Sequence, residues 1–343
     1  MNSDAIARRP TLQDVAEATG TSISTVSRAL NGSPRVGAQT RDRIREEANR
    51  IGYQVDLAGS LLRRSSPRNV GLICRLEQEL HSELHDQMLA RAEAIGLNLV
   101  VQSVSQNNPA SRAIQALEQL RCQAVVVVDP SQLPELRPES VRMPLIAVGQ
   151  DAPTGAAALV TSDNRVGMQQ LVAHLWEHQH REVRLLDGPA GASADARRKA
   201  FEEASTQVGL SYRVVAAGAS ADAGYQATRG LLERGELQQD SGPSALVCYN
   251  DQCAQGAYVA LLRGGQRPGQ DISVTGCDDS QIAISKAFDL TSINRQPAKL
   301  ASLAVELAGK WMGPTRQAAA APERCKVNTK LVVRGSSGPA PRK

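Results

Sequence analysis

Aromatic residues are scarce in this chain, which has 2 Phe, 5 Tyr and 2 Trp among 343 residues. No apolar run approaches the ~18–20 residues that would span a bilayer, which argues against a membrane protein. The first ten residues contain charged side chains and a proline, and they have no apolar segment of the secretory-signal type. The six cysteines form no CxxC pair and no Cys/His ligand spacing, so we expect buried, reduced thiols and no metal site. These absences favour a cytoplasmic globular protein without a cofactor.

Catalytic signatures are also lacking, since no Walker loop, GxSxG, GxGxxG or HExxH occurs, and the chain is predicted not to be an enzyme. Its net charge of +4 is small, but the charge is unevenly placed. The first 70 residues carry 11 arginines against 7 acidic residues, whereas bases and acids are equal in number in the rest. The positive surplus therefore lies in the N-terminal segment, where it suits contact with phosphate groups.

Residues 11–31 have the pattern of two short helices joined by a tight turn. Thr11 and Asp14 are placed to cap the first helix, Gly20 ends it, and Ser22 caps the second. The outward, N-terminal side of the second helix carries an isoleucine, small hydroxyl residues and an arginine, namely Ile23, Ser24, Thr25, Ser27 and Arg28. With a third helix over about 38–51, this predicts a helix-turn-helix unit. The alternative is a surface bundle whose arginines are only a solvated face.

The stretch TLQDVAEATGTSISTVSRALNGSPRVGAQTRDRI (11–44) resembles the DNA-binding headpiece of LacI/GalR-type transcriptional regulators. The resemblance implies that Ile23, Ser24 and Arg28 face base edges in the major groove. It also implies a set of residues that hold the phosphate backbone: Ser22, Thr25, Ser27, Asn31, Arg35 and Thr40. Arg28 is chemically the best base reader, because its guanidinium fork matches guanine O6 and N7.

Residues 53–68 are predicted to be a linker. Alone, the segment 57–64 is too short for a stable helix, and Gly59 weakens it further, so one reading is a flexible tether. Within the family this segment is a hinge that becomes helical on DNA, and Leu62 stands at the position of the leucine that enters the minor groove. Val55 and Asp56 depart from the usual pattern, in which Pro and Asn are common there.

Beyond residue 69, short β-branched runs alternate with helical stretches such as 82–95 and 111–121, which is typical of parallel α/β sheets. The runs form two sets, at 70–74, 97–102, 124–129 and 144–148, and at 182–187, 212–217, 244–249 and 271–276. Together with family-like phrases such as VTSDNRVGMQQLVAHL (160–175), they identify a periplasmic-binding-protein-like core. The expected fold is an all-α helix-turn-helix headpiece joined to an α/β two-lobed periplasmic-binding-protein-like core.

The domain boundaries follow from this pattern. We expect the headpiece with its hinge at 10–66 and a ligand-binding and dimerisation core at 69–334. Lobe 1 is assigned to about 69–162 and 294–320, and lobe 2 to about 163–292 and 322–334. The third crossover between lobes is thus expected near 320, and residues 335–343 are expected to be a flexible tail. The tail has no leucine heptad, which favours a dimer over a tail-mediated tetramer.

Three residues match ligand-binding positions of the family, namely Arg197, Asn250 and Asp278. Their chemistry suits a polyol, because Arg donates, a carboxylate accepts and an amide does both. The alternatives are that Arg197 lies on a helix surface, with Arg198 as a competitor, that Asn250 caps a helix, and that Asp278 belongs to a turn. Relatives often stack their ligand on aromatics at two places that here lack them, at 75–85 and 216–222.

The missing aromatics leave two interpretations of Arg75, His81 and His85. The preferred one is that they are solvent-facing polar loop residues, and the other is that they help to bind a more anionic ligand.

The expected protein is a repressor that binds double-stranded operator DNA as a homodimer and takes a carbohydrate or an anionic sugar derivative as its effector. The alternative is a solute-binding receptor, which would leave the N-terminal segment unexplained.

We predict that Arg28→Ala weakens binding to a cognate operator more than binding to random DNA. Loss of a bidentate contact to one base costs about 1–3 kcal/mol of discrimination against the wrong base, whereas loss of a phosphate contact weakens all sequences alike. Titrations of both DNAs at one fixed salt concentration measure the difference. Equal losses on the two DNAs would contradict a base-reading role.

Overall fold

The computed structural model describes residues 10–30, 33–53, 68–133, 136, 141–237, 242–312 and 321–341. The chain divides into two compact units, at residues 1–67 and 68–343. Asn31 and the hinge prediction at 57–64, including Leu62, lie outside the described residues. None of the helices in the described ranges combines the length and apolar character needed to cross a membrane.

The N-terminal unit contains three helices, α1 (Leu12–Thr19), α2 (Ile23–Leu30) and α3 (Ala38–Arg50). Thr11 and Asp14 form a capping box at the start of α1, and Gly20 ends the helix with φ of 62°. The Ser22 hydroxyl accepts a hydrogen bond from the Thr25 N–H at 3.2 Å, so Ser22 caps α2 as predicted. The small apolar core is built from all three helices and consists of Val15, Ala16, Val26, Ala29, Val36, Ile44 and Ala48.

The larger unit contains two six-stranded sheets. The first has the order β11-β5-β4-β3-β1-β2, and its strands in chain order are β1 (Asn69–Cys74), β2 (Asn98–Ser103), β3 (Ala124–Val128), β4 (Leu145–Val148), β5 (Ala158–Asp163) and β11 (Glu323–Asn328). The second has the order β12-β10-β9-β8-β6-β7, with β6 (Glu182–Asp187), β7 (Ser211–Ala216), β8 (Ala245–Cys248), β9 (Ser273–Asp278), β10 (Thr291–Asn294) and β12 (Lys330–Val332). The named strand pairs are parallel, apart from β10 and β12. We call the first sheet and its helices lobe 1, and the second sheet and its helices lobe 2.

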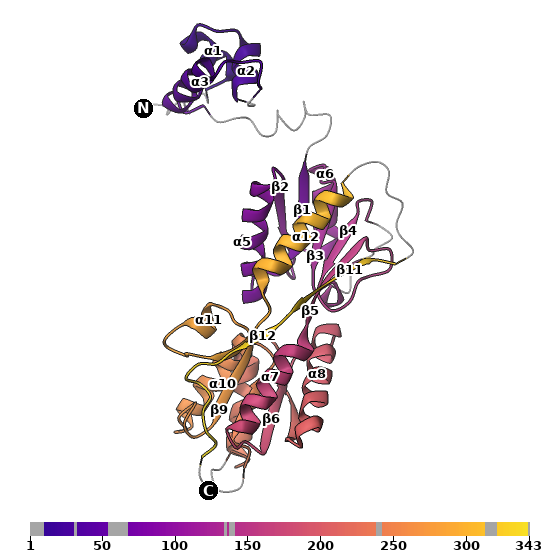
Figure 1. Cartoon of the computed structure of the whole chain (residues 1–343), viewed down its shortest axis with the longest axis vertical. Coiled ribbons are helices and arrows are strands. Elements are labelled where there is room, and N and C mark those ends of the chain that lie inside the picture. The colour runs from indigo at the N-terminus through magenta and orange to yellow at the C-terminus, as the bar shows by residue number, and fades with distance from the viewer. Residues whose placement is uncertain are drawn as a thin grey trace, which may run out of the picture. The chain divides into compact units, whose positions relative to one another are not determined.

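Helices cover the sheets because each buries an apolar stripe against the strands. In lobe 1, α5 (Glu79–Ala94) and α12 (Pro297–Trp311) pack on one face of the sheet, and α6 (Ala110–Gln119) packs on the other (Figure 1). In lobe 2, α7 (Asn164–Glu177) and α8 (Ala192–Val208) lie side by side on one face. The remaining helices of this lobe are α9 (Ala221–Glu233), α10 (Asp251–Arg263) and α11 (Gln281–Ile284).

The chain crosses between the lobes three times. The first crossover joins β5 to α7 at residues 163–164, and the second joins β10 to α12 at 295–296. The third joins β11 to β12 at Thr329, so the prediction of a crossover near 320 is wrong. Residues 323–328 belong to lobe 1 because β11 pairs with β5 over six residues.

The three crossovers are held together by buried hydrogen bonds. The Thr329 hydroxyl donates to the Asp163 carbonyl at 2.6 Å and accepts from the Gly167 N–H at 3.0 Å. Gly167 has no room for a side chain, since a Cβ would lie 2.6 Å from Ile293 Cγ2 and 2.7 Å from Thr329 Oγ1. On the second crossover, Arg295 Nε donates to the Ser162 hydroxyl at 3.1 Å. We call this set of contacts the crossover clasp.

All six cysteines carry free thiols, and five of them are buried, as expected. Burial, assisted by Glu77, raises the pKa of Cys74 to about 11, and burial raises the pKa of Cys122 to about 12. These thiols are therefore protonated and unreactive at neutral pH.

The C-terminal segment differs from the flexible tail that we expected from residue 335 onward. Ser336 is buried, and its hydroxyl donates to the Val274 carbonyl at 2.6 Å and accepts from the Thr291 N–H at 2.8 Å. Ser337 contacts the ring of His174 at 2.9 Å, and the Ala340 N–H donates to the His178 carbonyl at 2.8 Å. The residues up to 341 are small and polar, so composition alone suggested a solvated tail, but they supply hydrogen bonds that lobe 2 needs.

We predict that Ser336→Ala destabilises the core, because it leaves a buried N–H and a buried carbonyl without this partner. Such a loss costs about 1–3 kcal/mol, which for a unit of this size lowers Tm by several degrees. Thermal unfolding followed by circular dichroism measures the change. Ser111→Ala, on the exposed side of α6, is the matched control and is expected to leave Tm unchanged. Equal Tm values for the two variants would contradict a structural role for the segment.

Candidate functional site

The outward side of α2 presents the residues that the sequence assigned to DNA contact. Ile23 is 49% exposed, and Ser24 and Arg28 are exposed as well. The Ser22 hydroxyl lies 2.9 Å from that of Ser24 and 2.8 Å from that of Thr25, so these three hydroxyls form a cluster at the helix start. Arg35 is exposed in the loop before α3, whereas Ser27 and Thr40 are partly buried.

Two arginines of α3 have a structural use that the sequence did not reveal. Arg41 donates to the Val36 carbonyl at 3.0 Å, and Arg43 donates to the Thr19 carbonyl at the end of α1 at 3.2 Å. Both bonds tie α3 to other parts of the bundle. These two arginines therefore stabilise the unit, whereas Arg45 on the same helix is exposed.

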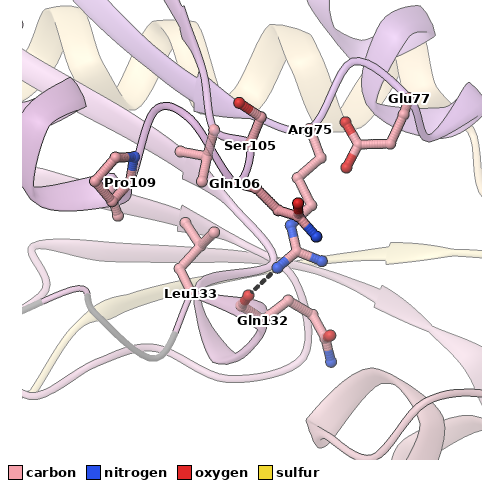
Figure 2. Close-up of a pocket in the computed structure, with 9 residues that line it drawn as sticks. Arg75, Glu77, Ser105, Gln106, Pro109, Gln132 and Leu133 are labelled. Atoms are coloured by element: carbon pink, nitrogen blue, oxygen red, sulfur yellow. Dashed lines mark hydrogen bonds between the residues drawn. The ribbon is translucent and has the colours of Figure 1, made fainter.

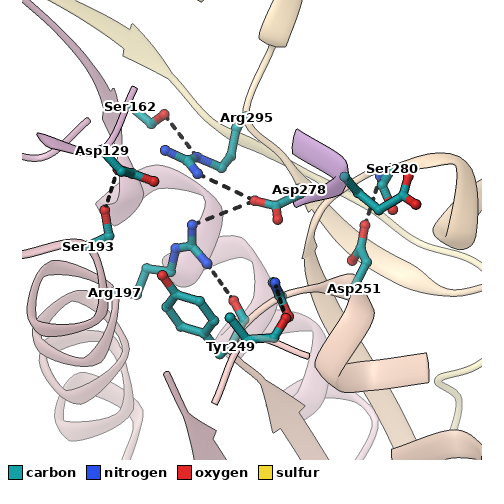
Figure 3. A network of polar contacts seen from close by, with 12 residues as sticks. Asp129, Ser162, Ser193, Arg197, Tyr249, Asp251, Asp278, Ser280 and Arg295 are labelled. Atoms are coloured by element: carbon teal, nitrogen blue, oxygen red, sulfur yellow. Dashed lines mark hydrogen bonds and ion pairs between the residues drawn. The ribbon is translucent and has the colours of Figure 1, made fainter. Parts of the chain in front are cut away.

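In the core, a buried polar network lies where the carboxyl ends of both sheets meet (Figure 3). Its lobe 1 part centres on Asp129, which directly follows β3. One carboxylate oxygen accepts from the Ser193 hydroxyl on α8 at 2.8 Å, and the other lies 3.3 Å from His81 Nε2 on α5. Because His81 Nδ1 accepts the Arg75 N–H at 3.0 Å, Nε2 carries the proton and donates to Asp129.

The surroundings of Asp129 keep it ionised. Burial opposes the charge, but the hydrogen bonds from His81 and Ser193 and the positive charge of Arg295 outweigh it and lower the pKa of Asp129 below its usual range. The backbone of Asp129 has φ of 44°, and a Cβ on Gly149 would lie 2.9 Å from its carboxylate. A glycine after β4 is therefore needed to make room for this carboxylate.

The lobe 2 part of the network centres on Asp278, the last residue of β9. One carboxylate oxygen lies 3.4 Å from Arg295 Nη1 and 3.6 Å from Arg197 Nη2. Arg197 also donates to the Tyr249 carbonyl at 2.6 Å, and its guanidinium lies 4.3 Å from the centre of the Tyr249 ring. Asp278 therefore joins α8 to the second crossover, and through Ser162 the network reaches lobe 1.

The structure separates the two arginines that the sequence left in competition. Arg197 is 5% exposed and reaches the network. Arg198 is only partly buried and pairs with Asp187 and Asp195 instead. Of the three residues expected to bind a ligand, Arg197 and Asp278 therefore lie together.

Asn250 is engaged by the fold itself. Its Oδ1 accepts from the Cys253 N–H at 2.8 Å, so the residue caps α10, and its Nδ2 donates to the Ala219 carbonyl at 3.0 Å. The capping interpretation is thus correct. One amide hydrogen and one lone pair remain beyond these two bonds.

Asp251 lies beneath the network and is buried. Its two carboxylate oxygens accept from the Ser292 hydroxyl at 2.6 Å and from the Ser280 N–H at 2.7 Å. Burial, followed by repulsion from Asp278, raises the pKa of Asp251 to about 7 against these hydrogen bonds. The site thus contains one carboxyl group held ionised and another that titrates near neutrality.

Direct hydrogen bonds also cross between the lobes at the edge of the network. Gln132 Nε2 donates to the Ala190 carbonyl at 3.1 Å, and Gln252 Nε2 donates to the Glu77 carbonyl at 3.2 Å. Together with the bond from Ser193 to Asp129, they hold the two lobes against each other. A small molecule that enters between the lobes has to replace some of these bonds.

A cavity of about 380 Å³ opens at the carboxyl edge of the first sheet (Figure 2). Its wall includes the side chains of Arg75, Gln106, Gln132 and Leu133, and Arg75 donates to the Gln132 carbonyl. None of the described residues that line it is aromatic. The cavity is large enough for a small polar molecule and lies next to the interlobe contact made by Gln132.

The preferred interpretation of His81 and His85 as loop residues is wrong. Both lie on α5, which begins at Glu79, and His81 is buried. Asp129, Ser193 and Arg295 were not among the site residues predicted from the sequence. The signal for Asp129 was its place directly after a buried strand, at the edge of a parallel sheet where ligands collect. No local signal pointed to Ser193 or His81, because their role depends on how separate helices pack.

Comparison with known proteins agrees with this architecture. The family model described as bacterial regulatory proteins, lacI family, matches residues 11–56, and that of the periplasmic binding protein-like domain matches residues 172–337. The lactose operon repressor of Klebsiella pneumoniae is 30% identical over 346 residues, which cover 97% of this chain and 93% of that repressor.

Solved structures share the fold. A Lac repressor dimer bound to operator and the anti-inducer ONPF has a TM-score of 0.74 and 24% identity, with 96% of this chain and 100% of that chain covered. A complex of the transcriptional regulator CelR with cellobiose has a TM-score of 0.67 and 24% identity, with the same coverage.

The fold and the relatives define a class of protein, the transcriptional regulators that carry a helix-turn-helix unit and a periplasmic-binding-protein-like core. Within that class, the chain belongs to the LacI family of bacterial regulatory proteins. It is therefore a regulatory protein and not an enzyme.

The raised pKa of Asp251 predicts a pH-dependent contribution to stability. The folded state holds this proton more tightly than the unfolded chain, so the contribution is complete below the ordinary aspartate pKa and is lost as pH rises through about 7. Asn cannot ionise, so Asp251→Asn is expected to gain about 4 kcal/mol relative to the native protein between acidic and mildly alkaline pH.

Urea unfolding at several pH values measures this difference. Asp222→Asn, an exposed carboxylate in the first turn of α9, is the control and is expected to follow the native profile. A constant offset between Asp251→Asn and the native protein at every pH would show that Asp251 does not titrate in this window.

Proposed function

We propose that the protein is a ligand-responsive transcriptional repressor that binds a pseudo-palindromic operator as a homodimer. The observation that carries this proposal is the combination, in one chain, of a helix-turn-helix unit with an exposed polar α2 and a core whose lobes meet through a buried polar network. The first suits contact with DNA, and the second suits a small molecule that changes how the lobes meet. Such a protein acts in the cytoplasm, where operator DNA lies.

For DNA recognition, we assign base contacts to Ile23, Ser24 and Arg28. Their exposure supports this assignment, since an exposed isoleucine has an apolar contact to make, such as the methyl group of thymine. We assign phosphate contacts to the surrounding residues Ser22, Thr25, Ser27, Asn31, Arg35 and Thr40. The hinge at 57–64, with Leu62 entering the minor groove, belongs to the same proposal, as do the headpiece boundaries 10–66.

We propose that the effector is bound by Arg197, Asn250 and Asp278 of lobe 2. Asp129 of lobe 1 is a fourth proposed effector-binding residue. A hydroxyl group both donates and accepts, so a polyol can take the place of the Ser193 bond to Asp129 and of the Arg197 contact with Asp278. The contacts favour a neutral sugar over an anionic one. Arg197 and Arg295 are already paired with Asp278, so an anion would have to compete with a carboxylate that is in place.

The effector acts by binding the two lobe arrangements with different affinity, because a ligand that binds both equally shifts nothing. The interlobe bonds of Ser193, Gln132 and Gln252 break when the lobes separate. An effector that replaces these bonds with its own contacts binds the separated lobes and the joined lobes with different affinity, and this difference shifts the equilibrium between the two arrangements.

For the dimer, two-fold symmetry of the protein matches a pseudo-palindromic operator. Two exposed apolar side chains, Leu262 on α10 and Ile284 on α11, are 52% and 49% exposed and are available to a second copy. The shared fold of a Lac repressor dimer that is bound to operator supports the same arrangement here.

The experiment that tests this function is selection of genomic fragments by the intact protein, followed by gel shifts with the recovered site. We expect a site with two-fold related halves that shifts with the intact chain and not with a chain lacking residues 1–66. Sugars that serve as substrates for the products of the neighbouring genes are then added to the shifted complex. We expect one of them to change the affinity of the protein for DNA.

Two results would contradict the proposal. Failure of the intact chain to select any site, while a sugar still binds the core in calorimetry, would favour a solute-binding receptor. Selection of sites without two-fold symmetry would argue against the homodimer.

A further inference from the structure

A second cavity, of about 410 Å³, lies beside the first crossover and is separate from the cavity at the carboxyl edge of lobe 1. One wall belongs to lobe 1 and contains Thr161, Arg324 and Lys326 from β5 and β11. The other belongs to lobe 2 and contains Asn164 from α7 and Lys199 from α8. The cavity therefore has both lobes as walls, with a crossover between them.

The register of the edge strands explains why cations line this wall. Leu159 pairs with Arg324 and Thr161 with Lys326, so these side chains share one face of the sheet. The opposite face carries Val160 and Val327, which pack in the core against α12. Because α12 covers only that opposite face, the long cationic side chains extend into the cavity and solvent.

The charges around the cavity do not balance. Four cations line it, namely Arg165, Lys199, Arg324 and Lys326, against the two carboxylates Asp163 and Glu203. Asp163 is held by Arg165 at 2.8 Å and by Lys326 at 3.7 Å, and Glu203 lies 4.0 Å from Lys199. Within the ranges that the structure describes, Arg324 forms no ion pair. The cavity thus has two more positive than negative charges.

A buried amide points to a missing partner at the same place. Asn164, the first residue of α7, is 6% exposed and is one of the residues that line the cavity, and its buried Nδ2 has no hydrogen-bond acceptor among the described residues. An unpaired buried donor costs about 1–3 kcal/mol, so it normally has a protein, water or ligand acceptor. This donor does not belong to the network at Asp129 and Asp278.

We propose that this cavity is a binding site for a small oxyanion, a phosphorylated or dicarboxylate metabolite, distinct from the effector site. The anion accepts a hydrogen bond from Asn164 Nδ2 and is held by the charges of Arg324, Lys326 and Lys199. Asp163 does not repel it strongly, because Arg165 already pairs with that carboxylate at 2.8 Å. Since the walls belong to different lobes, the anion binds one lobe arrangement more tightly and acts on the same equilibrium as the effector.

The test is calorimetric titration of the intact protein with inorganic phosphate and, separately, with malonate, at constant ionic strength. We expect saturable binding of at least one of them, and the two arms distinguish a phosphoryl from a carboxylate ligand. Arg324→Gln is expected to weaken binding roughly five- to tenfold, because it removes the cation without an ion pair in the described structure. Arg112→Gln, with the same loss of charge on the exposed side of α6, is the matched control and is expected to bind as the native protein does.

Asn164→Ala tests the amide. It removes the unpaired donor without adding a charge at this buried position, so the protein is expected to fold and to bind the anions more weakly. Circular dichroism checks the fold of each variant. Absence of saturable binding of both anions, or equal effects of Arg324→Gln and Arg112→Gln, would overturn the proposal. Because no DNA is present, that outcome would leave the proposed DNA-binding function intact.

Discussion

The hydrogen bonds of the Thr329 hydroxyl are the constraint on which the core depends. The chain passes between the lobes three times, and Thr329 binds the Asp163 carbonyl of the first crossover and the Gly167 N–H of the helix that follows it. A third passage is possible beside them because position 167 has no side chain. The lobes are thus joined at one edge by a narrow, buried connection, so a change in how they meet has to pass through the crossover clasp.

The polar network at the carboxyl ends of the sheets is a second connection between the lobes. Asp129 and Asp278 come from different lobes, yet Arg295 and Ser162 connect them through the second crossover. The polar groups in it are largely satisfied by one another, as burial requires. In the proposed function, a small molecule that binds there competes with these existing bonds, and its binding energy is converted into a change of lobe arrangement.

The elements of this protein were largely predictable from local sequence. The capping box at Thr11, the turn at Gly20 and the apolar runs of the sheets are local patterns, and the structure places helices and strands close to where they were expected. The third crossover was misplaced because β11 has few apolar residues, so its membership of lobe 1 shows only in its pairing with β5. The ordered residues after 335 were missed for a related reason, since Ser336 is polar but buried by lobe 2.

The sequence by itself determined the family, the helix-turn-helix unit and the three candidate ligand residues Arg197, Asn250 and Asp278, because these depend on motifs. Only the tertiary structure decided that Arg197 and not Arg198 reaches the network, that His81 is buried against Asp129, and that Asn250 is engaged in a helix cap. The physical reason is that each of these roles requires a partner far away in the sequence or a particular direction of the side chain. Such partners are brought together only when separate helices pack on the same sheet edge.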